Sequence, residues 1–322
     1  MKLVSIIIPL YNSENYISET IDSCINQGNC IKEIIIIDDH STDNSWNIVK
    51  LYKEKYPSLI KLEKNIGKGG NQARNYGFSI SKGQYIQWLD ADDILAPDKI
   101  ENQLRLMEET QGDGILVSCG WIKFENNISE GIYKKQLIDK DYKVPVNWLA
   151  DSWEGKGMGQ TSIWLTHRKL IENAGQWNEN LLINQDGEFF CRVIINASKI
   201  IFCKDSFIYY RTNIHSSVSK NAGYEYAKSK LESYKLYEIV LFSKNSEYLK
   251  KALARNYFSF IYENYPGYSD LNKLSKLYIR DLGINKIESS IGGKKFRLLS
   301  KLLGFENAIR FKNCFNYKNK LL

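Results

Sequence analysis

Short runs of apolar, β-branched residues alternate with amphipathic stretches along the N-terminal third of the chain. Residues 3–9 and 32–38 are continuous apolar runs of strand length, typical of strands that are buried on both faces of a parallel sheet. Between these runs, apolar residues recur at helical spacing, at Tyr16, Ile17, Thr20, Ile21, Cys24 and Ile25. Further strands at 59–63 and 85–89 alternate with helices in the same way. This pattern predicts an α/β fold with an open, Rossmann-like, mostly parallel sheet flanked by helices.

The rest of the chain divides near residue 220. Strands are predicted at 114–124, 161–165 and 199–210, with helices at about 167–174 and 188–197. From about residue 224 onward helical spacing dominates, with tyrosine and leucine interleaved among lysine. We therefore expect one α/β domain over residues 1–219, with halves at about 1–110 and 111–219, and a helical C-terminal region over 220–322.

Polar clusters follow each of the four N-terminal strands. They begin at Pro9, Asp38, Asn65 and Asp90. In an open parallel sheet, ligands bind outside the carboxyl ends of the strands, so these clusters are expected to converge on one edge. Turn chemistry alone would explain any one of them. It does not, however, require carboxylates after both the second and the fourth strand.

The cluster Asp90-Ala91-Asp92-Asp93 carries the strongest indication of chemistry. Three carboxylates packed this tightly repel one another, and the arrangement persists at neutral pH only where a positive group compensates for it. Mg²⁺ and Mn²⁺ take oxygen ligands and are commonly bound by one or two carboxylates together with substrate phosphates. The alternative is that these aspartates form a turn and cap the helix that Pro97 opens, a role that fits Asp93 best.

Composition and charge narrow the class of protein. The 322 residues are 43% apolar and 25% charged, as in an ordinary soluble protein. No apolar run approaches the ~18–20 residues that span a bilayer, and the N-terminus does not resemble a signal peptide, so a cytoplasmic location is expected. The six cysteines lack metal-ligand spacing and are interpreted as small buried residues.

Charge is distributed unevenly along the chain. Residues 220–322 carry 20 Lys and Arg against 9 Asp and Glu, a net charge of +11, whereas residues 1–219 carry a net charge of −4. No helix-turn-helix or zinc-finger spacing accompanies the basic region, so nucleic acid is not an expected partner.

Six motifs occur in the order that they have in one known family. They are VSIIIPLYN, IIIIDDHSTDNS, NIGKGGNQARNYG, QWLDADDILAPDKI, WNENLLINQDGEFFCRV and YYRTNIHSSVS. On these motifs the chain resembles the inverting glycosyltransferases of family 2, which have the GT-A fold. The resemblance runs from residue 4 to about residue 219, roughly the first two thirds of the chain.

The resemblance implies a nucleoside diphosphate sugar as donor, in the first place a UDP-sugar. Tyr11 would line the base, Asp38 or Asp39 would accept hydrogen bonds from the uracil or ribose, and Arg74 would contact the nucleotide or the aspartates. Asp90 and Asp92 match the two aspartates of the DxD motif, with Asp92 as the ligand of Mn²⁺ or Mg²⁺. The remaining positions implied for the nucleotide sugar and the metal are Pro9, Lys68, Ala91, Arg211 and His215.

Asp186 is the candidate general base, which has to accept the proton of the acceptor hydroxyl. The family usually has Glu-Asp at this place, and the Gln185-Asp186 of this chain keeps only the aspartate. The alternative is that Asp186 caps a helix starting near Glu188. Three further candidates would bind the acceptor, although the alternative for the two tryptophans is a place in the core: Trp164, Trp177 and Glu188.

The C-terminal 29 residues have the composition of a membrane-surface segment. Residues 294–322 carry eight basic residues and one acidic residue, and Phe296, Leu299 and Leu303 recur at helical spacing, with Leu298 and Leu302 beside them. A basic amphipathic helix of this kind can bind an anionic membrane surface, here the inner face of the plasma membrane. The alternative is an ordinary helix that packs its apolar stripe on the catalytic domain.

The expected activity is therefore transfer of a hexosyl or N-acetylhexosaminyl group to a glycan or lipid-linked glycan in bacterial surface-polysaccharide synthesis. The alternative is a non-catalytic module of the same fold that binds a sugar nucleotide or a glycan. A nucleotidyltransferase is disfavoured, because it would need a basic glycine-rich segment where the chain has Tyr11-Asn12-Ser13-Glu14.

Overall fold

The computed structural model describes residues 3–110, 112, 114–212, 221–284 and 291–318. The chain forms two compact units. The first consists of Met1–Trp148, Met158–Asn180 and Gln185–Ser217, and the second of Leu149–Gly157, Leu181–Asn184 and Val218–Leu322. The second unit thus includes two short segments that precede residue 218 and that no feature of the sequence marks.

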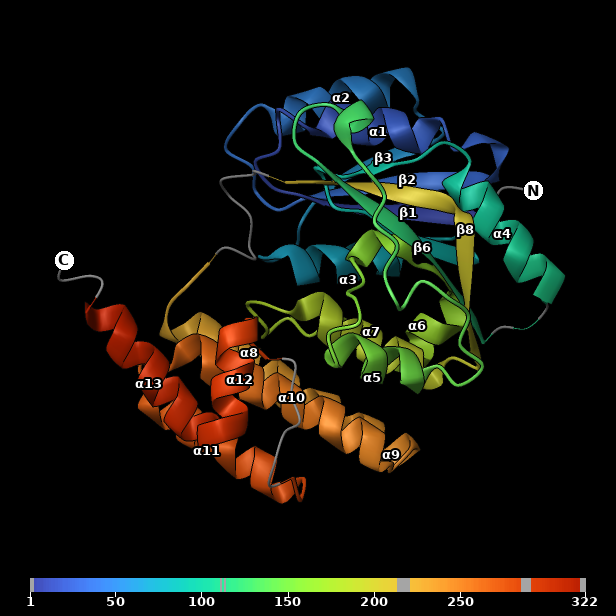
Figure 1. Cartoon of the computed structure of the whole chain (residues 1–322). Coiled ribbons are helices and arrows are strands. Elements are labelled where there is room, and N and C mark those ends of the chain that lie inside the picture. Colours follow the sequence, from blue (N-terminus) through green and yellow to red (C-terminus); the bar gives the residue numbers. More distant parts are fainter. Residues whose placement is uncertain (1–2, 111, 113, 213–220, 285–290, 319–322) are drawn as a thin grey trace. The chain divides into compact units, whose positions relative to one another are not determined.

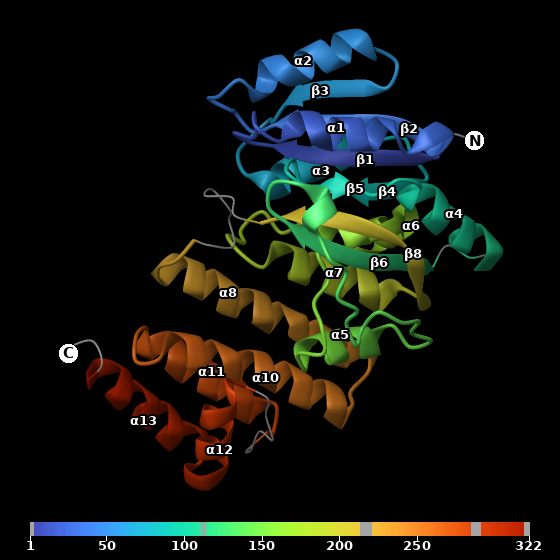
Figure 2. The same ribbon diagram turned by 45° about the horizontal axis from the view of Figure 1, so that its top comes forward.

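The first unit is built on one sheet of eight strands among the described residues, in the order β3-β2-β1-β4-β7-β6-β8-β5 (Figures 1 and 2). Neighbouring strands run parallel except for the pairs that involve β7 and β5. The predicted mostly parallel sheet is confirmed. The bounds of the strands are β1 Val4–Leu10, β2 Ile31–Asp38, β3 Ile60–Lys64, β4 Tyr85–Trp88, β5 Ile94–Leu95, β6 Ile115–Phe124, β7 Leu165–His167 and β8 Lys199–Arg211.

The prediction of a strand over residues 161–165 is wrong in position. Thr161–Ile163 form a short 3-10 turn, and strand β7 begins only at Leu165. The side chain of Gln160 stabilises the turn, because its amide oxygen accepts a hydrogen bond from the backbone N–H of Ser162 at 2.7 Å. Capping by a side chain competes with strand pairing at this point.

Helices cover both faces of the sheet. Figure 1 shows α1 and α2 on one face and α3 on the other, as expected when right-handed connections lead outward from β1 to β3 and then back to β4. The helices that lie wholly or partly in the first unit are α1 Ile17–Ile25, α2 Ser45–Lys55, α3 Gly70–Ile80, α4 Lys99–Thr110, α5 Val146–Trp153, α6 Arg168–Ala174 and α7 Gln185–Asn196.

Helix α3 packs unusually close to the sheet. A Cβ atom on Gly77 would lie 2.6 Å from Cγ2 of Ile7 on β1 and 3.3 Å from Cγ1 of Ile37 on β2. Both isoleucines are 0% exposed, so neither has free space into which to move. The absence of a side chain at Gly77 therefore sets how near α3 comes to the strands.

The second unit is helical in its described part, as predicted for the C-terminal region. Tyr257 and Phe260, both 0% exposed, lie in its core. No helix in the described part of the chain is both long enough and apolar enough to cross a membrane. Its helices are α8 Tyr224–Leu236, α9 Val240–Ser243, α10 Glu247–Asn264, α11 Ser269–Asp281, α12 Lys294–Leu303 and α13 Phe305–Lys318.

Substitution Gly77→Ala is expected to destabilise the protein by roughly 1–3 kcal/mol, because the added methyl group overpacks the contact between α3 and the sheet. Chemical denaturation monitored by circular dichroism measures the change. The control is Ser79→Ala on the exposed face of the same helix, which should change stability by less than about 0.5 kcal/mol. Equal stability of the two variants would contradict the tight packing at Gly77.

Candidate active site

The backbone of the four-residue segment after β4 is held by two other elements. Thr20 on α1 donates a hydrogen bond from its hydroxyl to the carbonyl of Ala91 at 3.0 Å. Arg211, at the end of β8, donates from Nε to the carbonyl of Asp92 at 3.1 Å. Because hydrogen bonds from both sides satisfy these carbonyls, the positions of the aspartates do not depend on a flexible loop.

Asp93 has a structural role, because its buried carboxylate connects the segment after β4 to two other parts of the first unit. Its side chain is 0% exposed and accepts hydrogen bonds from Nε2 of Gln160 and from the backbone N–H of Arg211, the latter at 3.1 Å. Burial and the nearby charges of Asp92 and Asp90 raise the pKa of Asp93 well above its ordinary value. The expectation that Asp93 caps a helix is wrong in detail, since α4 begins only at Lys99.

Asp90 and Asp92 differ in how their charges are balanced. Asp90 forms an ion pair with Arg74 of α3, with 2.7 Å between Oδ1 and the guanidinium Nη2. Burial and the charge of Asp90 raise the pKa of Asp92 to about 7, and the charges of Arg211 and Arg74 oppose this shift only in part. Among the described residues, no side chain donates a hydrogen bond to the carboxylate of Asp92.

Asp186 lies within electrostatic range of the same charges. It is in the first turn of α7, which begins at Gln185, so the alternative that Asp186 caps a helix starting near Glu188 is wrong. Burial raises the pKa of Asp186, the charge of Asp90 raises it further, and the charge of Arg74 lowers it. The structure therefore brings Asp186 together with Asp90 and Arg74, which lie about 100 residues earlier in the chain.

Tyr210 lies within electrostatic range of all of these carboxylates, and it is not among the residues expected from the sequence. Burial and then the charges of Asp93, Asp92, Asp90 and Asp186 raise the pKa of its phenol to about 12. Its ring lies edge-on to Trp121, with 5.7 Å between the centroids. A tyrosine near a strand end carries no distinctive sequence signal, so only the tertiary structure identifies this position.

The two aspartates after β2 have different environments. Asp38 is 0% exposed and forms an ion pair with Lys64 at 2.6 Å. Asp39 is partly exposed, and its carboxylate accepts hydrogen bonds from Nδ2 of Asn65 at 2.7 Å and from the backbone N–H of Gly69 at 2.8 Å. The sequence did not distinguish between Asp38 and Asp39 as the residue that contacts the nucleotide. Asp39 can contact a ligand without breaking an ion pair, whereas Asp38 cannot. Asp39 also fixes the glycine-rich loop.

The remaining donor-side candidates lie at the same edge of the sheet. Tyr11 follows β1 and is 57% exposed, so its ring is available to a planar ligand. Pro9 lies in β1 opposite Ile37, and Lys68 is exposed in the loop that Asp39 fixes. Since β1, β2 and β4 are parallel neighbours, their carboxyl ends meet at one edge of the sheet.

Arg211 does not present its guanidinium to a ligand in this structure. Besides the bond to Asp92, Nη2 forms an ion pair with Glu19 of α1 at 2.6 Å, and the guanidinium lies over the ring of Phe124, 4.4 Å from its centroid. The diphosphate contact expected of Arg211 stays a prediction, and it would require the ion pair with Glu19 to open. Arg211 holds the aspartate segment and contributes positive charge behind Asp92.

The three acceptor candidates are buried. Trp164 and Trp177 are 1% and 3% exposed, in agreement with the alternative that both belong to the core. Glu188 is 4% exposed and forms an ion pair with Arg192 one turn later at 2.7 Å, so its carboxylate is not available to an acceptor. His215 lies outside the described residues.

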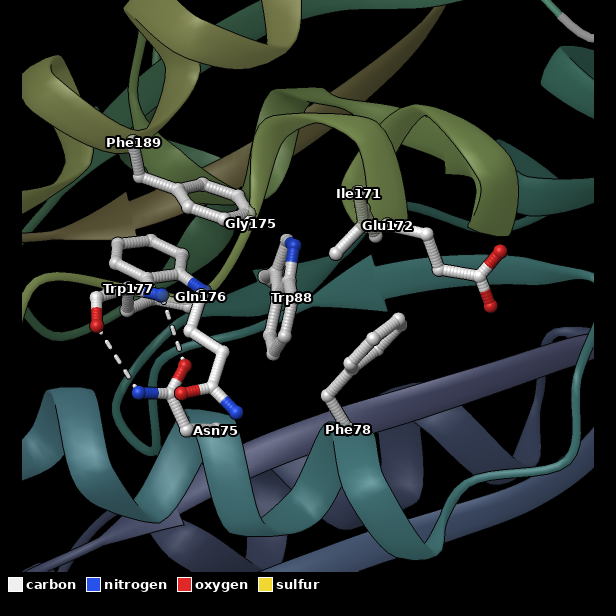
Figure 3. Close-up of a pocket in the computed structure, with 9 residues that line it drawn as sticks. All are labelled: Asn75, Phe78, Trp88, Ile171, Glu172, Gly175, Gln176, Trp177 and Phe189. Carbon is white, nitrogen blue, oxygen red and sulfur yellow. Dashed lines mark hydrogen bonds between the residues drawn. The ribbon is translucent and has the colours of Figure 1, made fainter.

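An aromatic cavity of about 120 Å³ lies beside Trp177. Figure 3 shows Trp88, Trp177 and Phe189 around it, with Asn75 and Phe78 approaching from α3. None of the site carboxylates lines this cavity, so it is separate from the charged edge of the sheet.

The described residues contain no group of three or more His, Cys, Asp or Glu side chains arranged to enclose a metal ion. Asp92 nevertheless has the properties of a partial cation site. The negative charge of Asp90 repels that of Asp92, and the positive charges of Arg211 and Arg74 compensate for this repulsion only in part. A divalent cation that takes most of its ligands from substrate phosphates and water needs only one or two protein carboxylates. The carboxylate oxygens of Asp92 and Asp90 fit such an ion.

Comparison with known proteins identifies the family of this chain. The model of the family described as Glycosyl transferase family 2 matches residues 5–179. The chain is 32% identical over 224 residues to a poly(ribitol-phosphate) beta-glucosyltransferase of Bacillus spizizenii, a match that covers 67% of this chain and 34% of that protein. This chain thus spans about a third of the length of that relative.

Two further comparisons extend the match. The chain is 44% identical over 108 residues to the UDP-Glc:alpha-D-GlcNAc-diphosphoundecaprenol beta-1,3-glucosyltransferase WfaP of Escherichia coli, covering 34% of this chain and 42% of that protein. The crystal structure of S. aureus TarS residues 1–349 in complex with UDP superposes with a TM-score of 0.63 at 18% identity, covering 87% of this chain and 88% of that one. The structural similarity shows that the fold is of the GT-A type.

Substitution Asp92→Asn is expected to stabilise the metal-free protein above pH 7, by on the order of 4 kcal/mol. The pKa of Asp92 in the folded protein, about 7, exceeds its ordinary value of 3.8, so folding opposes ionisation of this group. The gain should therefore be complete above pH 7, decrease between pH 7 and pH 4, and disappear below pH 4. Thermal unfolding at several pH values measures it.

The same variant tests the cation site. Mn²⁺ should raise the unfolding temperature of the wild-type protein and leave that of Asp92→Asn nearly unchanged, because binding to the folded state alone stabilises it. An equal response of both proteins to Mn²⁺ would remove Asp92 from the metal site.

Proposed function

The chain belongs to glycosyl transferase family 2, and from this premise we propose that it transfers a sugar from a UDP-sugar to a hydroxyl of a glycan or lipid-linked glycan, with inversion at the anomeric carbon. The observation that carries the proposal is the meeting of Asp92, Asp90, Arg74 and Asp186 at one edge of the sheet. A partly balanced carboxylate and a buried carboxylate of raised pKa suit two different tasks, cation binding and proton transfer.

The names of the similar proteins support the choice of donor, acceptor and pathway. One is named for glucosyl transfer from UDP-Glc to a diphosphoundecaprenol-linked sugar, and another for glucosylation of poly(ribitol phosphate). We extend to this chain the uridine nucleotide sugar that the first of these names contains, and an acceptor that is a lipid-linked sugar or a polymer of surface-polysaccharide synthesis. The exposed ring of Tyr11 and the partly exposed Asp39 would contact the uridine, and Lys68 and Arg74 provide positive charge for the diphosphate.

Asp92, with Asp90 beside it, would bind Mn²⁺ or Mg²⁺ together with the diphosphate of the donor. When bound, such an ion supplies positive charge that stabilises the departing nucleotide. The protein itself keeps the two carboxylates at fixed positions, through Arg74 at the side chain of Asp90 and through Arg211 at the carbonyl of Asp92.

Asp186 would act as the general base. As the acceptor oxygen forms its bond to the anomeric carbon, Asp186 takes the hydroxyl proton, and the bond to the diphosphate breaks with its electron pair leaving on UDP. Burial raises the pKa of Asp186 and makes it a stronger base than an exposed aspartate. A backbone hydrogen bond at Gly187, in the first turn of α7, and the charge of Arg74 both oppose that shift and favour the ionised form that accepts the proton.

Substitution Asp186→Asn is expected to lower kcat about 10²- to 10⁴-fold, because the amide cannot accept the proton. Calorimetric affinity for UDP with Mn²⁺ should stay within about threefold of wild type, since the donor contacts remain. For the wild type, kcat should rise with pH as Asp186 loses its proton, with the acidic limb above the ordinary range for aspartate.

Two results would redirect this proposal. Loss of transfer in Glu188→Gln, with retention in Asp186→Asn, would move the base to the other acid of α7. A wild-type protein that binds UDP with Mn²⁺ but neither hydrolyses nor transfers any sugar from a panel of nucleotide sugars would favour the non-catalytic binding module.

We further propose that the C-terminal helices contact an anionic membrane surface, where a lipid-linked acceptor resides. Leu298 and Leu302 on α12 are 63% and 75% exposed, on the helix that also exposes Lys294, Lys295 and Lys301. Phe296 of the same helix is buried and packs on Tyr262 of α10, with 4.7 Å between the ring centroids. Exposed leucines beside lysines suit insertion into the headgroup region of an anionic bilayer.

The double variant Leu298→Ser/Leu302→Ser should bind vesicles that contain phosphatidylglycerol roughly tenfold more weakly than wild type, because two apolar side chains no longer insert. Co-sedimentation measures the affinity, and added salt should weaken binding of both proteins by screening the lysines. The control is Phe242→Ser, which replaces a residue that is 92% exposed on α9. Equal sedimentation of wild type and the double variant would refute the membrane contact.

A further inference from the structure

Trp177 lies in a stack between the active-site arginine and helix α7. The ring of Phe189 is parallel to the indole of Trp177, with 4.1 Å between centroids and 8° between planes. The guanidinium carbon of Arg74 lies 4.7 Å from the centroid of the same indole. Because Phe189 covers one face at van der Waals distance, the guanidinium has only the other face available.

The backbone of Trp177 is fixed by the helix that carries Arg74. The side-chain amide of Asn75 accepts a hydrogen bond from the backbone N–H of Trp177 at 2.8 Å and donates one to its carbonyl at 3.0 Å. Figure 3 shows this pair of bonds. Asn71, one turn earlier on α3, donates to the carbonyl of Asn178 at 2.7 Å. The indole is therefore held in register with Arg74 by the neighbours of Arg74.

The stack connects the two halves of the active site. At one end, Arg74 binds Asp90 at 2.7 Å. At the other end, Phe189 follows Asp186 by three residues on α7, so both lie on nearby parts of one helix face. Trp88, on the strand that leads to Asp90, packs edge-on against both Trp177 and Phe189, with centroid distances of 5.4 and 5.8 Å.

The choice of tryptophan at position 177 has a local cost. Nε1 of Trp177 is buried and has no hydrogen-bond partner among the described residues, and a buried unpaired donor is destabilising. Phenylalanine would avoid that cost and still fill most of the volume. Tryptophan, however, attracts a cation to its ring face more strongly than phenylalanine does. With 3% exposure the indole cannot touch a substrate, so its benefit has to lie in the contact with Arg74.

We propose that Trp177 is a positioning residue, which aims the guanidinium of Arg74 at Asp90 and sets the spacing between that ion pair and Asp186. This inference rests on the proposed glycosyltransferase function. Trp177 already lines a cavity of about 120 Å³, so a smaller side chain at position 177 would enlarge that cavity and remove the ring face that Arg74 contacts. Arg74 would then shift, and its influence on both carboxylates would weaken.

Trp177→Leu removes the ring face, and Trp177→Phe keeps a smaller one. We expect kcat to fall about 10- to 100-fold in Trp177→Leu, because a displacement of about 1 Å near the reacting groups has an effect of this size. In Trp177→Phe, kcat should recover at least in part. The matched control is Phe190→Leu, which removes the next ring of α7 from the same aromatic cluster. Phe190 stacks on Trp164 and meets Trp177 only edge-on, at 6.2 Å, so its loss should lower the unfolding temperature with little change in kcat.

A double-mutant cycle with Arg74→Gln separates positioning from general loss of packing. In the Arg74→Gln background, Trp177→Leu should reduce kcat by less than about twofold further, because the two residues act through one contact. The acidic limb of the kcat profile should move to higher pH in both single variants. The charge of Arg74 lowers the pKa of Asp186 while that of Asp90 raises it, and Tyr210 is neutral in this range.

A readout without turnover keeps this inference distinct from the proposed function. The pKa of Asp186, followed by carbon NMR of protein with labelled aspartate and assigned with Asp186→Asn, should rise in Trp177→Leu and not in Phe190→Leu. Independent effects of Trp177→Leu and Arg74→Gln on kcat, or an unchanged pKa of Asp186 in Trp177→Leu, would overturn the positioning role. If the wild-type protein transfers no sugar, but the pKa of Asp186 still rises in Trp177→Leu, the proposed function alone is overturned and the positioning role stands.

Discussion

Mutual repulsion among three closely spaced carboxylates is the constraint on which the first unit depends. Each is accommodated differently. Asp93 is fully buried and bonded to Gln160 and to the backbone of β8, and burial raises its pKa. Asp90 is paired with Arg74. Within the part of the chain that the structure describes, Asp92 has neither a paired cation nor a donor side chain, so it retains the charge that a divalent cation and a diphosphate together can balance.

The two arginines near these carboxylates have separate roles. Arg211 bonds to the carbonyl of Asp92 and to Glu19, and thereby joins β8 and α1 to the segment after β4. Arg74 acts on side chains, through its ion pair with Asp90 and its field at Asp186. The ion pair of Arg74 and Asp90 therefore affects both the proposed cation site and the proposed general base. This explains why the pKa of Asp186 on α7 depends on charges from α3 and from the segment after β4.

Much of the fold could be predicted because its strands are buried on both faces. Ile6, Ile7 and Ile8 are all 0% exposed, and such a run has no alternation that would suggest an antiparallel sheet. The position of β7 was missed because Gln160 caps the turn before it, a contact without periodicity. Tyr210 was missed for a related reason, since nothing in the sequence indicates that it lies within electrostatic range of the aspartates. Trp177 and Glu188 were assigned to the acceptor because the sequence does not reveal their burial.

The sequence by itself determined the alternation of strands and helices in the N-terminal third, the family, and the loops that carry the carboxylates, because these depend on local periodicity and on short motifs. Only the tertiary structure decided which charged groups balance which. Ion pairs such as Arg74 with Asp90 and Arg211 with Glu19 join residues separated by 16 and 192 positions. Electrostatic energy depends on distance in space and on burial, and neither quantity can be read from residue types along a chain.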